Sequence, residues 1–413
     1  MKVAIISSSD LYGGAARAAY RLHKSLIKEG IHSVMIVQKK ISDDYTVIGS
    51  SSRLKGLLNS LRPALDHIIM KYVKSKTLFS SSYLPFSSIV DKINELNPDI
   101  VHLHWIAGGT LRLEDLNKIK APIVWNCHDM WPFTGGCHYD DSCGAYKDGC
   151  GNCKVLNSKK ENDLSKKVFN RKLKIYSKAK DMTVVGSSNW ISKCAKESTL
   201  FKKREIVTIP NCIDTNLFKP IDKNITRDIF NIPKNKKVIL FGAMNSLSDP
   251  RKGAEELFKA IEMIDVENTV FVIAGSSKPM EPLNLKYPVC FIPPLIDEVS
   301  LPLMYNVADV MIVPSLQENL ANSIVESMSC GVPVVAFNIG GNKDMIDHKK
   351  NGYLSNAFKA EDMAFGIKWI LENDNYTQLS YNSREKILNK FESSLVANKY
   401  IKLYKNILKS KQW

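Results

Sequence analysis

Long apolar segments are absent from this chain of 413 residues. No run of about 18 or more apolar residues occurs, so the sequence predicts no membrane-spanning helix. The opening residues, MKVAIISSSD, hold only a short apolar run after Lys2, which is too short for the apolar core of a secretory signal peptide and indicates a strand. We therefore expect a cytoplasmic protein in a reducing compartment, where disulfides are rare.

Internal repeats and low-complexity segments are also absent, and acidic residues are fewer than basic ones. The chain carries 57 Lys and Arg against 42 Asp and Glu. Residues 1–222 hold 34 Lys and Arg against 21 Asp and Glu, whereas residues 223–413 hold 23 against 21. The first half should therefore attract anions such as phosphorylated ligands, anionic lipid or nucleic acid. Aromatic residues are sparse among its lysine runs, which disfavours a single-stranded nucleic acid surface.

Strand and helix patterns alternate along both halves of the chain, which is too long for one ordinary core. This alternation predicts an α/β protein with two doubly wound, Rossmann-like parallel sheets. A polar segment that contains Pro220 marks the boundary, which gives an N-terminal domain over 1–217 and a C-terminal domain over 218–395. A basic helix at 396–413 is expected to pack back on the N-terminal domain. Strands are expected at 2–7, 32–38, 98–105, 121–129, 181–188, 205–214, 236–243, 268–277, 308–315 and 331–338.

Leucine and isoleucine recur at helical spacing between residues 53 and 76, with basic residues among them and an interruption at Pro63. A basic amphipathic helix of this kind can lie on anionic lipid. An ordinary helix that packs its apolar stripe on the core fits the same pattern equally well. The sequence leaves both interpretations open.

Two glutamates, Glu318 and Glu326, stand out in the segment PSLQENLANSIVESMSCGVPVVAF. A strand ends just before Glu318, and a helix that Asn322 or Ser323 can cap runs on toward Gly331. Both glutamates should face the carboxyl ends of the strands, where doubly wound folds bind ligands. Each carboxylate can accept hydrogen bonds from two vicinal sugar hydroxyls, and the helix N-terminus offers amides to a phosphate. Taken alone, the spacing also suits two solvated glutamates.

Basic or glycine-rich segments follow the first strand of each half. Arg251 and Lys252 open a helix, where a diphosphate would meet both side-chain charge and the helix dipole. Gly13 and Gly14 precede the first helix and let the backbone approach a ligand closely. The third glycine and the ribose-binding acid of the dinucleotide fingerprint are missing, so this is a different kind of glycine loop.

Cysteines cluster in one glycine-rich segment that has few apolar residues. Four of them form a candidate metal site: Cys137, Cys143, Cys150 and Cys153. Only the last pair has the tight spacing of a metal knuckle. Four thiolates would suit a structural zinc, with His138 as a possible substitute ligand, and they leave no open position for a catalytic zinc. Disulfides, free thiols or another metal, including an iron–sulfur cluster, stay open as alternatives.

Taken together, these motifs resemble the retaining glycosyltransferases of family four. The segments YGGAARAAYRL, HLHW, PNCIDTNLFKP, GAMNSLSDPRKG and QENLANSIVESMSCGVPVVAFNIGGNKDMI occur in the order seen in that family, over essentially the whole chain. The resemblance implies a GT-B fold, with two Rossmann-like domains facing across a cleft. The segment NCHDMWPFTGGCHY is similar to a bacterial branch that makes surface polysaccharide, such as capsule, exopolysaccharide or O-antigen.

The resemblance also implies roles in binding the donor. Glu326 would bind the nucleotide ribose, and Glu318 would lie near the donor sugar, with the backbone of Asn319 and Leu320 close to sugar and phosphate. Lys252 would bind the diphosphate.

Three further positions follow from the same resemblance. His128 would contact the transferred sugar and the reaction centre, and Gly13 and Gly14 would lie near the donor phosphates and the acceptor. Relatives commonly carry a second diphosphate-binding arginine where this chain has Ala243, so Arg251 is the candidate replacement.

We therefore predict transfer of a hexose from a nucleoside-diphosphate sugar to an acceptor hydroxyl, with retention and without a catalytic metal. The acceptor would be a glycan or a polyprenyl-diphosphate-linked sugar, held by the basic first domain as a peripheral protein on the inner face of the plasma membrane. The alternatives are a nucleotide-sugar epimerase or hydrolase of the same fold, and a non-enzymatic zinc- or nucleic-acid-binding protein. A glycosidase would also use two carboxylates, but it has no need of a Lys–Arg phosphate site.

Overall fold

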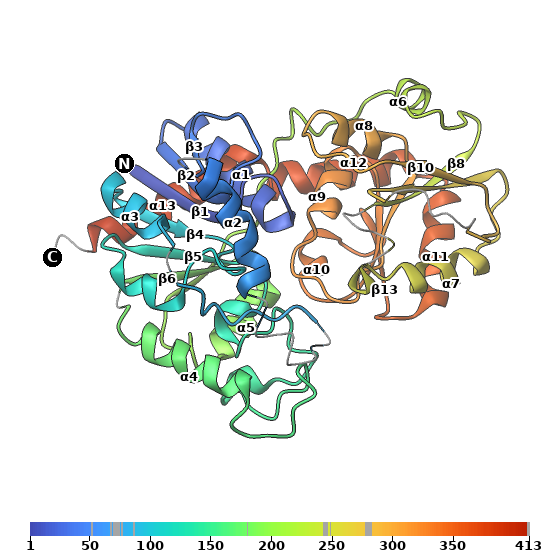
Figure 1. The fold of residues 1–413 in the computed structure, drawn as a ribbon. Coiled ribbons are helices and arrows are strands. Elements are labelled where there is room, and N and C mark those ends of the chain that lie inside the picture. The colour runs from blue at the N-terminus through green and yellow to red at the C-terminus, as the bar shows by residue number, and fades with distance from the viewer. Residues whose placement is uncertain are drawn as a thin grey trace. The chain divides into compact units, whose positions relative to one another are not determined.

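The structure is a computed structural model, and it describes residues 1–50, 53–66, 68, 75, 77–85, 87–179, 181–242, 247, 249–276 and 283–410. The chain forms two compact units (Figure 1). Unit 1 comprises Met1–Pro210 together with Val396–Trp413, and unit 2 comprises Asn211–Leu395.

Unit 1 is built on a seven-stranded sheet in the order β3-β2-β1-β4-β5-β6-β7, and every neighbouring pair is parallel. Its strands are β1 (Lys2–Ser9), β2 (His32–Lys39), β3 (Val47–Ile48), β4 (Ile100–Leu103), β5 (Ile123–Cys127), β6 (Met182–Gly186) and β7 (Ile206–Thr208). Its helices are α1 (Gly14–Lys28), α2 (Arg53–Asp66), α3 (Ile89–Leu96), α4 (Leu164–Tyr176), α5 (Asn189–Glu197) and most of α13 (Ser393–Lys409).

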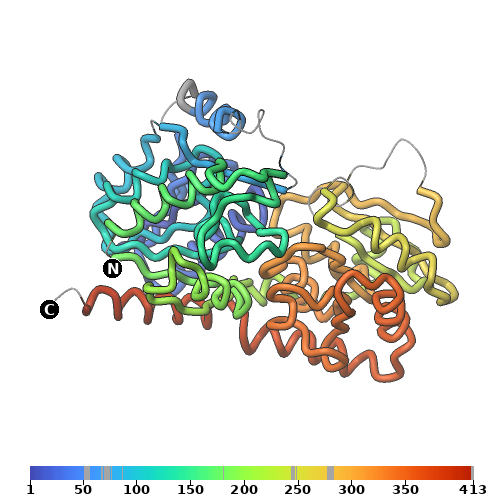
Figure 2. The backbone as a smooth tube through the Cα atoms, turned by 90° about the horizontal axis from the view of Figure 1, so that it is seen from below, coloured from blue at the N-terminus to red at the C-terminus, as the bar shows by residue number. Residues whose placement is uncertain are grey.

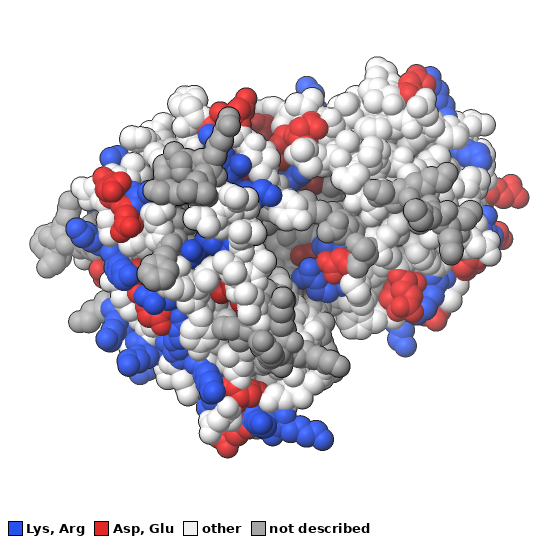
Figure 3. Space-filling model, viewed as in Figure 1, with Lys and Arg blue, Asp and Glu red and all other residues white. Residues whose placement is uncertain are grey.

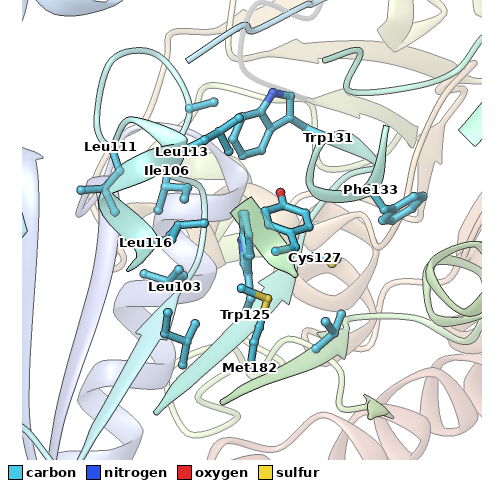
Figure 4. Packing of buried hydrophobic residues seen from close by; sticks show 14 of the residues in the cluster. Leu103, Ile106, Leu111, Leu113, Leu116, Trp125, Cys127, Trp131, Phe133 and Met182 are labelled. Carbon is cyan, nitrogen blue, oxygen red and sulfur yellow. The ribbon is translucent and has the colours of Figure 1, made fainter. Parts of the chain in front are cut away.

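Aromatic packing fills the core of unit 1 on one side of this sheet. Trp125 of β5 is fully buried, and its ring meets those of Tyr176 and Phe201 edge to face at centroid distances of 5.7 and 6.3 Å. Figure 4 shows Trp125 in the middle of the cluster, with Leu103 and Leu116 to one side. Edge-to-face contacts add to the burial of these large rings, so the end of β5 has a rigid base.

Unit 2 is built on a six-stranded sheet in the order β10-β9-β8-β11-β12-β13, again wholly parallel. Its strands are β8 (Lys237–Gly242), β9 (Thr269–Ala274), β10 (Val289–Ile292), β11 (Val310–Val313), β12 (Val334–Phe337) and β13 (Gly352–Ser355). Its helices are α6 (Lys223–Ile229), α7 (Ala254–Met263), α8 (Ser300–Asn306), α9 (Asn322–Ser329), α10 (Asn342–Met345), α11 (Ala360–Leu371) and α12 (Tyr376–Lys390).

Both faces of the unit 2 sheet are buried. Successive residues of β8 alternate between two hydrophobic clusters, with Val238 and Leu240 in one and Ile239 and Phe241 in the other. Side chains of a strand point to opposite faces in turn, so each cluster covers one face. A parallel sheet needs helices on both faces, and this accounts for the near-continuous apolar runs of its central strands.

The order of the strands reverses once in each sheet. In unit 1 the reversal lies between β1 and β4, and in unit 2 between β8 and β11. The expectation of two doubly wound, Rossmann-like sheets is therefore confirmed. Ligands of this architecture bind beyond the carboxyl ends of the strands at the reversal, which directs attention to the segments after β1, β4, β8 and β11.

The last helix, α13, returns to unit 1 as the sequence predicts. The Tyr404 hydroxyl lies 2.7 Å from Nδ1 of His102 in β4, and the Tyr400 ring packs on the same imidazole at a centroid distance of 5.1 Å. Nearer the start of the helix, Asn398 Nδ2 donates to Glu29 Oε2 at 3.0 Å. The end of the chain therefore completes the core of the N-terminal unit.

Helix α2 turns its polar side toward the protein and its apolar side outward. Arg62 Nε donates to the Gly109 carbonyl oxygen at 2.7 Å, and Asp66 is 6% exposed. The leucine stripe faces away from the core: Leu57, Leu58, Leu61 and Leu65 are 60%, 56%, 49% and 46% exposed. In Figure 2 this helix runs along the edge of unit 1.

Of the two interpretations for the 53–76 segment, packing of the leucine stripe on the core is therefore wrong. The described helix ends at Asp66, and the basic residues at 71, 74 and 76 lie outside the described residues. Among the helices that the structure describes, none has the length and apolarity that a membrane crossing requires.

Candidate active site

The segment after β11 forms the centre of the unit 2 site, at the reversal of its strand order. Two glycines let other loops press against its backbone. A Cβ atom built on Gly253 would lie 1.9 Å from the Pro314 carbonyl oxygen, and one built on Gly340 would lie 1.8 Å from the Glu318 carbonyl oxygen. Both glycines have positive φ, at 69° and 51°. Only glycine combines a favourable positive φ with the lack of a Cβ atom. These two loops can therefore approach the segment after β11 because they have no side chain at these positions.

Lys252 reaches Glu318 because of this packing. Residues Pro250–Lys252 form a short 3-10 turn, and Leu316 N donates to the Arg251 carbonyl oxygen at 2.8 Å. Lys252 Nζ then lies 3.3 Å from Glu318 Oε2, with the two side chains 29% and 14% exposed. The structure therefore brings together a predicted diphosphate-binding residue and a predicted sugar-binding residue as a half-buried ion pair.

Arg251 is engaged differently from what the sequence suggested. Its Nε and Nη2 donate to Asp249 at 3.1 and 2.7 Å. Asp249 therefore offsets the positive charge of Arg251, the candidate replacement for the diphosphate-binding arginine that relatives carry at the position of Ala243. Burial raises the pKa of Asp249, but the Arg251 and backbone hydrogen bonds outweigh it and hold that pKa below its usual range. Ala243, the position of the missing arginine, lies outside the described residues.

Asn319 and Leu320, the predicted backbone contacts, are buried, with 2% and 6% of the whole residue exposed. Asn319 N donates to Glu318 Oε1 at 3.2 Å, and Gly341 N donates to the Asn319 carbonyl oxygen at 2.8 Å. The following helix α9 begins at Asn322 with Ala321 as its N-cap. Ala321 makes no side-chain cap hydrogen bond, and neither predicted cap residue, Asn322 or Ser323, occupies the N-cap position.

Glu326 lies on α9 and is 5% exposed. Tyr305 of α8 donates its hydroxyl to Glu326 Oε2 at 2.6 Å. The sequence reasoning identified the glutamate but missed its tyrosine partner, which stands 21 residues earlier in the chain. The alternative of two solvated glutamates is wrong for this residue, because Glu326 is buried and hydrogen-bonded.

In unit 1 the predicted glycine loop follows β1. Gly13 is the N-cap of α1 with φ 94°, and Gly14 is the first residue of the helix. Just before them, the fully buried Asp10 accepts hydrogen bonds from Ile41 N at 2.9 Å and Ser42 Oγ at 2.8 Å. This carboxylate, which the sequence analysis missed, ties the loop after β2 to the end of β1.

Three imidazoles form a contiguous row at the ends of β4 and β5. His104 Nδ1 lies 2.8 Å from His128 Nε2, and the His102 and His104 rings are 4.4 Å apart between centroids. Burial lowers the pKa of His128 to about 4 and that of His102 to about 3, and it lowers the pKa of His104 as well. The row is therefore neutral near pH 7. In a neutral pair one nitrogen donates and the other accepts, so His104 orients the predicted active-site histidine.

Asp129, next to His128, is held by three donors. Its carboxylate accepts from His138 Nδ1 at 2.6 Å, Trp131 N at 2.9 Å and Trp105 Nε1 at 3.1 Å. Although burial raises the pKa of this carboxyl group, His138 is the main cause that lowers it overall. The other ring nitrogen of His138 lies 3.0 Å from Ser80 Oγ. With both ring nitrogens engaged, His138 is placed to support Asp129 and not to replace a cysteine at a metal.

The cysteine segment is ordered by burial in the core. Cys137, Cys150 and Cys153 are 5%, 7% and 8% exposed and belong to the hydrophobic clusters of unit 1, whereas Cys143 is exposed. The described residues, which include all four cysteines, contain no group of three or more His, Cys, Asp or Glu side chains that could hold a metal. The predicted structural zinc is therefore unsupported. Burial raises the pKa of Cys150 to about 12, which agrees with a packed neutral thiol.

Sequence models of two protein families match the chain over consecutive ranges. Residues 12–217 match the family described as Glycosyltransferase Family 4, and residues 222–386 match Glycosyl transferases group 1. Together the two ranges cover most of both units. The chain belongs to the group 1 and family 4 glycosyltransferases, and it is an enzyme that transfers a sugar.

Similar proteins come from bacteria and an archaeon. An uncharacterized 41.2 kDa protein in the cps region of Klebsiella pneumoniae is 25% identical over 81% of this chain and 88% of its own length. An uncharacterized glycosyltransferase of Methanocaldococcus jannaschii is 25% identical over 74% of this chain and 82% of its own length. The UDP-Gal:α-D-GlcNAc-diphosphoundecaprenol α-1,3-galactosyltransferase of Escherichia coli is 27% identical over 50% of this chain and 56% of its own length.

Solved structures match over nearly the whole chain. Sucrose-phosphate synthase from Thermosynechococcus elongatus has a TM-score of 0.69 at 18% identity and covers 99% of both chains. HepE of Anabaena, solved with UDP and glucose, has a TM-score of 0.67 at 16% identity, over 98% of this chain and all of that one. At these identities the likeness shows the fold, which is GT-B.

Replacing Gly340 with alanine should destabilise unit 2. The new methyl group would meet the Glu318 carbonyl oxygen in a backbone conformation that disfavours side chains, so we expect a loss of about 2–4 kcal/mol in the free energy of unfolding. Gly30→Ala is the matched control, because Gly30 has φ 77° with nothing within 4 Å of its built Cβ, and it should lose about 1 kcal/mol. If urea denaturation shows equal losses of unfolding free energy for Gly340→Ala and Gly30→Ala, the close contact between Gly340 and the Glu318 carbonyl oxygen is contradicted.

Lowering the pH should destabilise unit 1 between about pH 6.5 and 4. His102 and His128 have folded pKa values of about 3 and 4, below the unfolded value of about 6.5. The unfolded state therefore binds more protons in this window, and up to about 1.4 kcal/mol per histidine is lost with each pH unit. His23, with a pKa of about 4, acts in the same sense. Thermal unfolding across this range should show a weaker dependence of the melting temperature on pH for His102→Asn than for the wild-type protein. An equal dependence in the two proteins would contradict the lowered pKa of His102.

Proposed function

We propose that this protein transfers a hexose from a nucleoside-diphosphate sugar to a hydroxyl group of a polyprenyl-diphosphate-linked or other glycan acceptor, with retention of configuration. The proposed setting is the synthesis of a bacterial surface polysaccharide, on the inner face of the plasma membrane. Unit 2 would bind the donor, and unit 1 would provide His128 and the acceptor site.

The observation that carries the donor assignment is the Lys252–Glu318 pair beside the first turn of α9. One ammonium group, the amides of a helix start and a carboxylate lie where a doubly wound sheet binds its ligand. The ammonium group and amides suit a diphosphate, and the carboxylate suits sugar hydroxyls. HepE, which has the same fold, was solved with UDP and glucose, and this supports a nucleotide-sugar donor here.

A site of this kind works by holding charge that develops on the leaving group. As the bond between the sugar and the diphosphate breaks, negative charge grows on the phosphate oxygen, and Lys252 with the helix amides would stabilise it. The departing phosphate oxygen would accept the proton of the attacking hydroxyl on the same face of the sugar. This sequence of steps retains the configuration and requires no protein base. Because Lys252 and the helix amides would stabilise the charge of the leaving diphosphate, we expect no catalytic metal.

His128 would contribute as a neutral imidazole in this scheme. Its Nε2 is engaged with His104 Nδ1, and burial lowers its pKa to about 4. A neutral side chain of fixed orientation is suited to hydrogen bonding with a sugar hydroxyl. It does not act as a cation that stabilises negative charge. We therefore assign His128 a positioning contact with the transferred sugar.

The printed names of relatives support the choice of acceptor. The E. coli relative is a galactosyltransferase whose acceptor is linked to diphosphoundecaprenol, and the Klebsiella relative is encoded in a cps region. A further E. coli relative, 26% identical over 35% of this chain, is named as a putative colanic acid biosynthesis glycosyl transferase. A lipid-linked acceptor would require this protein to work at a membrane surface.

Helix α2 is the feature that fits a membrane surface. Its outward leucines would enter the headgroup region, since a helix with one apolar side lies in the interface. Unit 1 as a whole carries 38 Lys and Arg against 19 Asp and Glu, whereas unit 2 carries 19 against 23. In Figure 3, Lys and Arg gather over α4 of unit 1. A net positive charge on the unit that carries the exposed leucines favours a bilayer that contains anionic lipid.

A nucleotide-sugar epimerase or hydrolase of the same fold would use the same donor site. It differs in its product, because it would release free sugar or an epimer without any acceptor. Mass detection of products from a donor panel, with and without an acceptor lipid and with Glu318→Ala as the inactive control, would separate these activities.

Replacing Lys252 with methionine should weaken the binding of a nucleoside diphosphate by about 10- to 100-fold, because a hydrogen bond to a charged group contributes about 1.5–3 kcal/mol. The measurement is a thermal-shift titration with UDP, GDP and ADP in EDTA. Lys259→Met is the control, because Lys259 lies in the next helix and pairs only with the surface residues Glu255 and Glu256 among the ion pairs of the described chain. Failure of all three nucleotides to stabilise the wild-type protein would overturn the donor assignment.

Replacing Leu58 and Leu61 with glutamine should reduce binding to vesicles that contain phosphatidylglycerol by at least about ten-fold, because each exposed leucine would lose its burial in the bilayer. Flotation at low and high salt measures this. The double variant Ile225→Gln and Ile229→Gln, which changes exposed residues of α6 at 58% and 52% exposure, should float like the wild-type protein. If the wild-type protein does not float with these vesicles at either salt concentration, the membrane assignment is wrong.

A further inference from the structure

The buried hydroxyl of Tyr305 donates a hydrogen bond to the Glu326 carboxylate. Tyr305 is 3% exposed and Glu326 is 5% exposed, and the distance from the hydroxyl to Oε2 is 2.6 Å. A hydrogen bond to an ionised carboxylate is shorter and stronger than one between neutral groups. The contact therefore fixes the carboxylate more firmly than packing alone would.

The tyrosine is itself held by its helix. Its neighbour Asn306 donates through Nδ2 to the carbonyl oxygens of Pro302 at 2.8 Å and Lys219 at 3.0 Å, and accepts from Ile221 N at 2.9 Å. Helix α8 packs against α9 within one hydrophobic cluster, which contains the Tyr305 ring. The hydroxyl is therefore presented from a rigid element, at a fixed place relative to the helix that carries Glu326.

We infer that Tyr305 is a positioning residue for recognition of the nucleotide ribose: it sets the orientation of the Glu326 carboxylate so that this group accepts hydrogen bonds from the vicinal ribose hydroxyls. The inference rests on the proposed function, in which Glu326 binds the ribose. A carboxylate has about four acceptor positions, and the tyrosine hydroxyl occupies one of them. Vicinal hydroxyls demand a defined carboxylate plane, which a fixed Oε2 provides.

Tyr305→Phe is the direct test, because it keeps the ring in the core and removes only the hydroxyl. Binding of UDP and of 2′,3′-dideoxyuridine diphosphate is measured by calorimetry, or of the guanosine or adenosine pair if the thermal-shift panel selects that base. In the wild-type protein the dideoxy compound should bind at least about ten-fold more weakly, since it lacks both hydroxyls. In Tyr305→Phe this ratio should fall below about three-fold, while the affinity for the dideoxy compound stays within about two-fold of wild type.

Two matched variants make the result specific. Glu326→Gln should reduce the ratio as far as Tyr305→Phe does, and the double variant should reduce it no further, because both changes act through one carboxylate. Tyr353→Phe removes another hydroxyl that donates to a carboxylate in unit 2, at 2.7 Å from Asp362 Oδ1. This control should keep the wild-type ratio, and so it separates a local effect from general loss of a buried hydrogen bond.

The outcomes distinguish the inference from the function on which it rests. If the wild-type protein binds both compounds equally, ribose recognition by Glu326 fails and the inference fails with it. If Glu326→Gln abolishes the discrimination but Tyr305→Phe retains it, the donor assignment stands and the role of Tyr305 is overturned. An equal loss of affinity for both compounds in Tyr305→Phe also overturns the role, because it reports damage to the unit and no change in ribose recognition.

Discussion

Contact between bare backbones at the end of β11 is the constraint on which the donor side of this protein depends. Gly253 and Gly340 approach from two different loops, and each leaves no room for a methyl group against the segment Pro314–Glu318. Lys252 can reach Glu318, and Gly341 can hold the Asn319 carbonyl oxygen, only because those loops are seated this closely. The charges of the site are therefore arranged by steric fit before any attraction between them acts.

Unit 1 arranges its polar groups in the opposite way, through side chains packed on side chains. The row His102, His104 and His128 is buried enough that its members stay neutral near pH 7. The neighbouring Asp129 accepts hydrogen bonds from His138 and Trp105. Burial costs less for a neutral imidazole than for a charged one, and a buried carboxylate needs hydrogen-bond donors such as these. The histidine row therefore contributes side chains of fixed orientation and no positive charge.

Much of the fold could be predicted from the sequence because the central strands are near-continuous apolar runs. The strands that were not predicted, β3, β10 and β13, are two to four residues long, and β10 is only partly buried. Helix α2 shows a different limit. Its period of apolar residues predicts a helix, but which side faces the protein is decided by partners such as the Gly109 carbonyl oxygen, 47 residues away.

The residues of the candidate site also fall into those that the sequence indicates and those that it does not. Glu318 and Lys252 could be recognised because each follows a strand end directly, where the local pattern already suggests ligand chemistry. Tyr305, Asp10 and His138 could not, because each acts through a partner that lies far along the chain or on another element. The cysteines show a related limit: their spacing suggested a metal, whereas the structure gives that prediction no support and buries three of the four among hydrophobic side chains.

The return of α13 to unit 1 affects how the chain folds as it is synthesised. Residues 1–210 leave the ribosome before unit 2 does, but the His102 imidazole meets its Tyr404 partner, and the Tyr400 ring packs on it, only after α13 has emerged. Unit 2 lies wholly between these two parts, so it can be complete while unit 1 is still waiting for its final helix. The first unit to be made is therefore the last to be finished, and a nascent chain passes through a stage in which the histidine row is open at one end.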